Sequence, residues 1–238
     1  MRDLPAAVTR TEACDLCERL RHEFTAEELA SKAKIFYTGP ASLSLGRFAI
    51  LGLNPAEAGD VKSDPPLLGD NLTAFADKTG NDNFHRNSPL GRRFSTLIDY
   101  LGEPHETVFT SNVIFRRSAS LAALGPDPRK AFQRSWVVLK QLLDVVRPSL
   151  ILAIGSGPRS AFFYLREQVM EESSPEETAL SAGHGRWQVR RTHGSLCGRG
   201  VTVVGVPHLS YYEPKPDSDG LLLLRREIDA ARSRPAGG

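Results

Sequence analysis

A chain of 238 residues is long enough to bury one good-sized core, so we expect a single domain spanning 1–238. Its net charge of +2 is too small to indicate nucleic-acid binding, so any phosphate contacts must come from a local basic cluster. No run of about 18 apolar residues is present, and the first residues lack the apolar core of a signal peptide, which argues against a membrane span and against secretion. Three cysteines make no disulfide framework, so a reducing, cytoplasmic setting is expected.

Short apolar strands alternate with amphipathic helices along the chain. In chain order the sequence predicts a helical N-terminal extension (1–45), a strand (48–53), a long loop (57–87), a helix (88–101), a strand (108–114), a helix (127–146), a strand (150–154), a helix ending near Val169, a flexible loop (171–186), a short strand (187–191), a strand (201–206) and a helix (219–231). Such alternation is typical of a parallel sheet covered on both faces. We therefore expect an α/β fold, a three-layer sandwich around a mainly parallel, four-stranded sheet.

Polar residues follow three of these strands. Gly52 to Pro55 follows the first strand, Asn112 lies near the end of the second, and Pro207 to Ser210 follows the last. Open α/β sheets place their ligand sites at the carboxyl ends of their strands. The three segments are therefore candidates for one site.

In this order, the Gly-x-Asn-Pro loop, the strand-end asparagine and the Pro-His-x-Ser loop resemble the motifs of the uracil-DNA glycosylase superfamily, over roughly Cys14 to Pro214. The resemblance implies a monofunctional glycosylase that acts on uracil-containing DNA in base-excision repair and releases free uracil. Asn54 would orient the attacking water, His208 would stabilise the departing uracilate, and Asn112 would read the base. Leu209 stands where the family usually has proline.

The chemistry of these side chains fits those roles. An amide is no strong base, but it can orient water toward a cationic sugar, and a neutral imidazole can donate to the pyrimidine O2. The amide of Asn112 offers both a donor and an acceptor, as the uracil edge requires. Each residue also has an ordinary explanation: an Asn-Pro turn, a surface histidine and a strand-terminating asparagine.

Other positions are expected to contact the base or the DNA. The superfamily keeps a stacking Phe after the first motif, and Phe84 or Phe75 stands there; we choose Phe84 because a helix follows it, and we expect Leu53 to border the base. The resemblance gives Ser210 a phosphate contact, and Tyr211 and Tyr212 follow it, where relatives insert a wedge into the duplex. Basic residues near the same edge would suit phosphates or could be solvated surface charge: Arg92, Arg93, Arg116, Arg117, Arg190, Arg191 and Lys215.

The Cys14-x-x-Cys17 pair resembles the N-terminus of the iron–sulfur branch of these enzymes, which needs four cysteine ligands. Only Cys197 remains, and the expected places of the other two ligands hold Arg117 or Ser118, and Ser135. We therefore expect no cofactor and no metal. A zinc site from Cys14, Cys17, His22 and a distant fourth ligand is the alternative.

Two other functions stay open. One is a protein that binds uracil-containing DNA without turnover, or traps it covalently through His208. The other is a nucleoside or nucleotide hydrolase on a similar fold, for which the Gly155-Ser156-Gly157 turn could cradle a phosphate or be an ordinary turn. Nothing in the sequence argues against a monomer.

Overall fold

The computed structural model of the protein describes residue 15 and residues 40–43, 46–54, 89–104, 107–116, 118, 120, 122–125, 127–170 and 177–234. Several sequence predictions therefore lie outside the described residues: the helical piece of the N-terminal extension, the Cys14–Cys17 pair, Pro55, Phe75, Phe84 and Arg117.

The described residues form one six-stranded mixed sheet in the order β2-β1-β3-β6-β5-β4. Its strands are β1 (Phe48–Gly52), β2 (Phe109–Asn112), β3 (Leu150–Ile154), β4 (Thr178–Ser181), β5 (Gln188–Leu196) and β6 (Arg199–Val206). Pairing is parallel from β2 through β1 and β3 to β6, and antiparallel from β6 through β5 to β4. The prediction of a four-stranded sheet is therefore wrong, because two further strands extend one edge.

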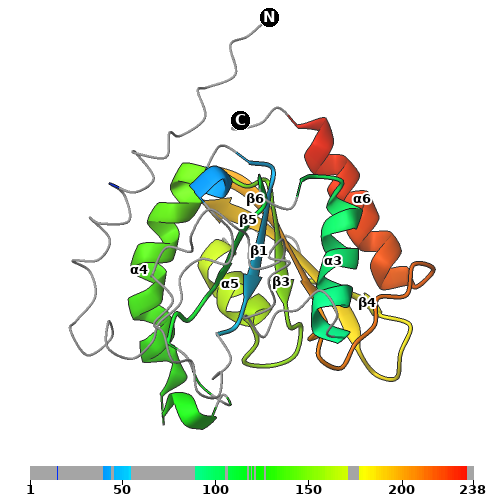
Figure 1. Cartoon of the computed structure of the whole chain (residues 1–238), viewed down its shortest axis with the longest axis horizontal. Helices are drawn as coiled ribbons and strands as arrows, with labels where there is room; N and C mark the ends of the chain where they lie inside the picture. Colours follow the sequence, from blue (N-terminus) through cyan, green and yellow to red (C-terminus); the bar gives the residue numbers. More distant parts are fainter. Residues whose placement is uncertain are drawn as a thin grey trace, which may run out of the picture.

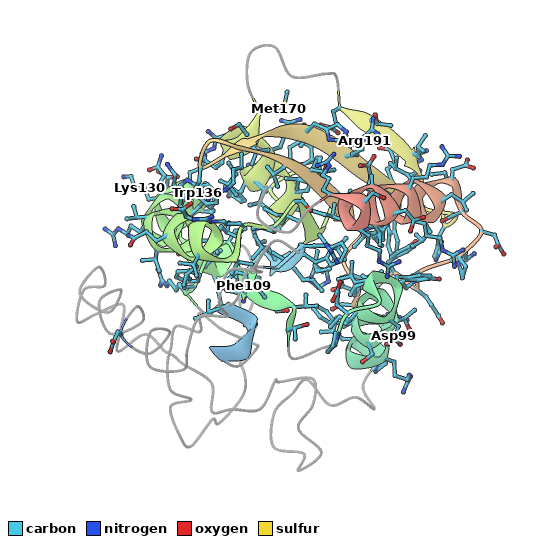
Figure 2. The ribbon with its side chains drawn as sticks, turned by 90° about the horizontal axis from the view of Figure 1, so that it is seen from above. Asp99, Phe109, Lys130, Trp136, Met170 and Arg191 are labelled. Carbon is cyan, nitrogen blue, oxygen red and sulfur yellow. The ribbon has the colours of Figure 1, made fainter. Side chains whose placement is uncertain are left out.

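Helices cover both faces of this sheet (Figures 1 and 2). They are α3 (Pro89–Leu101), α4 (Pro128–Val146), α5 (Ala161–Val169) and α6 (Asp219–Ser233), with short 3₁₀ turns at Pro40–Leu43 and Ala122–Leu124. Successive strand residues point to opposite faces, so Ala49 and Leu51 join the core under α4 and α5, whereas Phe48 and Ile50 join the core under α3 and α6. Continuously apolar strands thus fill two separate cores.

Local sequence signals set the bounds of the long helices. The Asp127 side chain accepts a hydrogen bond from Arg129 N at 3.2 Å and caps α4, whose first residue is Pro128. Arg147, at φ 54°, ends that helix in the left-handed conformation, and Pro148 cannot continue it. At α6, Ser218 accepts from Leu221 N at 3.3 Å. These bounds match the predicted helices closely.

The edge formed by β4 and β5 differs from the prediction. The segment 171–186 was expected to be a flexible loop, but Thr178–Ser181 forms β4, and the short strand at 187–191 is the beginning of the nine-residue β5. Ion pairs stabilise this edge: the Glu177 carboxylate contacts Arg166 at 2.7 Å and also pairs with Arg190. A polar sequence therefore forms strands here because its charges are paired across elements.

No helix in the described part of the chain combines the length and the apolarity that crossing a bilayer requires.

Candidate active site

The carboxyl ends of the four parallel strands lie at one end of the sheet (Figure 1). Gly52 is paired with Asn112 at the ends of β1 and β2. The pairing continues past the strands, because Val113 N donates to Gly52 O and Ile114 N donates to Leu53 O, both at 2.9 Å. The backbone under the predicted water-orienting and base-reading residues is thereby fixed.

Asn112 is a buried side chain with an unsatisfied polar atom. It is only 5% exposed, and its Nδ2 has no hydrogen-bond partner among the described residues. A Cβ at Gly52 would collide with Asn112 Oδ1, so glycine is required at 52 for the amide to lie here. Leaving a buried donor unpaired costs about 1–3 kcal/mol, which a ligand with an acceptor could recover.

The side chain of Asn54 is held by Ser118, which the sequence suggested for another reason. Its Nδ2 donates to Ser118 Oγ at 2.8 Å and approaches Ser118 O at 3.4 Å, and the Ser118 hydroxyl donates to Ser120 O at 2.8 Å. Ser118 lies where the family's iron–sulfur branch was expected to have a ligand. In this structure it instead orients the amide of Asn54.

The His208 imidazole has a defined tautomer. Ser210 N–H donates to its Nδ1 at 3.2 Å, which leaves the proton on Nε2. The ring keeps an exposed edge, yet the surrounding protein desolvates it, and this burial lowers the pKa of His208 below its usual 6.5. Near neutral pH the side chain is therefore a neutral Nε2–H donor.

Arg93 supports the loop that carries His208. From α3, its Nη1 donates to Leu209 O at 2.8 Å and to Ser210 O at 3.0 Å. The sequence had offered Arg93 as a phosphate contact, together with its neighbour Arg92. Arg92 is exposed on α3, so the two adjacent arginines have different surroundings.

The two tyrosines after this loop also differ. Tyr211 is 75% exposed, as a DNA wedge requires. Tyr212 is fully buried: its hydroxyl donates to Ala182 O at 3.2 Å, and its ring packs edge-on against Trp187. The prediction that Tyr212 contacts DNA is therefore wrong, because the turn at His208 directs it into the core under α3 and α6.

A hollow of about 480 Å³ lies beside His208. It is lined by Leu53, Pro207, His208 and Tyr211, by the turn at 155–160 after β3, and by the hairpin between β4 and β5. The structure thus brings together Leu53, Arg190, His208 and Tyr211 from the predicted set. The other described predicted residues do not line this hollow: Asn54, Arg92, Arg93, Asn112, Arg116, Arg191, Ser210, Tyr212 and Lys215.

Several lining residues were not predicted from the sequence: Arg159, Ser160, Arg186, Trp187 and Gln188. The Oγ of Ser160 is buried without a hydrogen-bond partner among the described residues. The only sequence signal for this side of the hollow was the Gly155-Ser156-Gly157 turn. The sequence predicts a loop up to Arg186 and a short strand from Trp187, and neither prediction indicates a binding role for these residues.

Cys197 and Ser135 are described residues at or near positions considered for metal ligands. Among the described residues no group of three or more His, Cys, Asp or Glu side chains could hold a metal ion. The Cys197 thiol lies 3.9 Å from Lys140 O, with its pKa raised by burial, while Ser135 Oγ accepts from Phe115 N at 3.0 Å. Each of these two residues has a local structural role.

No family model matches this chain, and no curated protein is similar to it in sequence.

Proposed function

We propose that this protein is a DNA glycosylase that hydrolyses the N-glycosidic bond of uracil in DNA, on a three-layer fold of the uracil-DNA glycosylase type. The observation that carries the proposal is the buried amide nitrogen of Asn112, which has no hydrogen-bond partner among the described residues and lies at the same end of the sheet as the neutral His208 donor. A planar base with acceptors on two sides would satisfy both groups.

The order of the strands supports a site for one base. Asn112 ends β2 and His208 follows β6, with β1 and β3 between them. Three strand spacings of 4.7–4.9 Å put the outer strands roughly 14 Å apart. Two side chains that reach inward across this distance leave room for a single pyrimidine ring. Beside Gly52, the amide of Asn112 occupies the place that a Cβ would take, so glycine lets this amide lie at the end of the sheet.

His208 would act on the leaving group. As the glycosidic bond breaks, its electrons move onto the pyrimidine, and negative charge develops at O2. A donor held in advance at that position stabilises the transition state more than the ground state. The Ser210 N–H and the two Arg93 hydrogen bonds hold the imidazole loop before the substrate arrives.

Asn54 would act on the other side of the sugar. Ser118 holds its Nδ2, so Oδ1 is the atom that would accept a hydrogen bond from the attacking water. The water adds to an oxocarbenium-like carbon and loses a proton to solvent. Since that cation needs little nucleophilic push, an amide suffices where a stronger base is absent.

The remaining residues would hold the DNA. Tyr211 is exposed and would fill the space that the flipped base leaves, and Ser210, Arg92 and Lys215 are exposed for phosphate contacts. Base flipping exposes the glycosidic bond to both catalytic groups.

The test is a chromatographic assay of base release from a single-stranded oligonucleotide with one uracil and from free deoxyuridine, paired with a denaturing gel. Release from the oligonucleotide alone is expected. Cleavage of deoxyuridine without affinity for DNA would favour a nucleoside hydrolase. A protein–DNA adduct without free uracil would favour covalent trapping through His208.

A further inference from the structure

One wall of the hollow beside His208 comes from the antiparallel edge and not from the parallel strands. The hairpin between β4 and β5 supplies Arg186, Trp187 and Gln188, and β5 adds Arg190. Ser156 Oγ donates to Gln188 O at 2.6 Å and so ties this wall to the turn after β3. The wall is therefore formed before any ligand binds.

The charge of the hollow favours an anion. Arg159, Arg186 and Arg190 line it, and no acidic side chain does. Arg190 is neutralised by Glu177, but neither Arg159 nor Arg186 forms an ion pair with any described residue, and both are exposed. Two cationic groups that have no counterion within the described part of the chain thus border the open space.

The same wall carries an aromatic surface. Trp187 is half-buried, and its ring contacts the Tyr212 ring at 5.8 Å and the His184 ring at 5.1 Å between centroids. The remaining part of the indole lines the hollow. An indole held beside guanidinium groups that pair with no described carboxylate matches a ligand with a planar ring and a phosphate, as in a nucleotide.

We propose that this wall is a second nucleotide subsite, which binds an unpaired nucleotide adjacent to the uracil nucleotide in the same strand. Its base lies against Trp187, and its phosphate lies between Arg159 and Arg186. The inference rests on the proposed function and adds the part of the substrate outside the base site. Since a base can stack on Trp187 only when it has left the duplex, the subsite favours single-stranded DNA.

The fluorescence of Trp187 tests this directly, because the chain contains two tryptophans. The other, Trp136, lies on α4, on the opposite side of the sheet from α3 and α6 (Figure 2), so Trp136→Phe leaves Trp187 as the only indole. This variant is titrated with a dye-labelled single-stranded oligothymidine that lacks uracil, and anisotropy and tryptophan emission are followed together. Quenching with the same midpoint as binding is expected.

Two further variants sharpen the test. Trp187→Leu should weaken binding of the single strand by about 5- to 150-fold, the range of base–aromatic stacking. Arg186→Ala should reduce the salt dependence of binding by about one phosphate contact, whereas Arg226→Ala, exposed on α6, should not.

The outcomes separate this inference from the proposed function. DNA binding without quenching of Trp187 would overturn the subsite and leave the glycosylase proposal standing. Neither binding of DNA nor release of uracil would overturn the proposed function and the subsite together.

Discussion

The parallel strands and the antiparallel edge belong to one sheet, but different forces stabilise them. All five residues of β3 are buried and apolar, and the strand lies between helices on both faces. In β4 no residue is fully buried, and the strand is accompanied by ion pairs from Glu177 and Arg191. Apolar burial therefore fixes the first region, and paired charges fix the second.

The two differently stabilised regions carry residues with two different proposed roles. The groups proposed to act on the base, Asn54, Asn112 and His208, follow parallel strands whose positions are set by core packing. Of the groups proposed to hold the neighbouring nucleotide, Arg186 and Trp187 lie on the antiparallel edge, whereas Arg159 lies in the turn after β3. Changes at Asn54, Asn112 and His208 should alter the rate of excision, and changes at Arg186 and Trp187 should alter affinity or stability.

The largest expected effect is from His208→Ala. Removing the donor at the developing oxyanion should lower the single-turnover rate of uracil release by about 10²- to 10³-fold. Binding of uracil-free single strands should change little. A rate within a few-fold of the wild type, with the fold intact by circular dichroism, would remove His208 from the chemistry.

A smaller loss is expected from Gly52→Ala. The added Cβ would collide with Asn112 Oδ1 and displace the amide, although residue 52 keeps an ordinary backbone conformation. Loss of one buried hydrogen bond to the base corresponds to about 1–3 kcal/mol, or roughly 5- to 150-fold in rate. The matched control is Gly200→Ala, where a Cβ meets open space. Equal activity in both variants would show that Asn112 does not read the base.

The adjacent arginines of α3 offer a finer comparison. Arg93→Ala removes two hydrogen bonds to the His208 loop and should lower kcat about 10-fold, with little change in the salt dependence of binding. Arg92→Ala should weaken DNA binding in a salt-dependent way and leave kcat unchanged. If both variants behave alike, Arg93 is a phosphate contact and not a positioning residue.

The smallest effect concerns the stability of the antiparallel edge. Burial raises the pKa of Glu177, but hydrogen bonds from Arg190 and Arg166 outweigh it and hold the pKa below 4.5. A lowered pKa means that the ionised carboxylate stabilises the fold above the unfolded-state pKa and loses this contribution as the pH falls through the folded-state value. Glu177→Gln should therefore cost roughly 1–2 kcal/mol in urea unfolding at neutral pH and nothing at low pH.

A matched surface pair provides the control for that measurement. Glu167 contacts Arg129 at 2.9 Å, but both side chains are more than one-third exposed. Glu167→Gln should therefore have almost no effect on the free energy of unfolding. A loss as large as that of Glu177→Gln would mean that burial does not distinguish the two ion pairs.

The comparison also explains what the sequence could predict. The bounds of β3 match the prediction, because a continuous apolar run between turn signals depends only on local pattern. The prediction missed the strand at Thr178–Ser181. Its neighbour Glu177 pairs with Arg166 in α5 and with Arg190 in β5, so the charges that stabilise this edge come from other elements of the fold. Long-range charge pairs leave no local periodicity.

Within the site, pairs of adjacent residues of the same type show the same limit of prediction from sequence. Sequence patterns cannot distinguish Tyr211 from Tyr212, or Arg92 from Arg93, because a turn or a helix face decides which residue is buried. The strand-end positions of Asn54, Asn112 and His208 were predictable. The support given by Ser118 to Asn54 was not, since it joins segments far apart in the chain.

The most direct test is the pH dependence of uracil release by the wild-type protein under single-turnover conditions, across roughly pH 5 to 8. Because burial lowers the pKa of His208, we expect the rate of release to fall toward low pH with a midpoint below pH 6.5. There a proton on Nδ1 would oppose the Ser210 N–H. An acid limb at or above pH 6.5 would contradict the neutral donor, and absence of release at every pH would contradict the glycosylase.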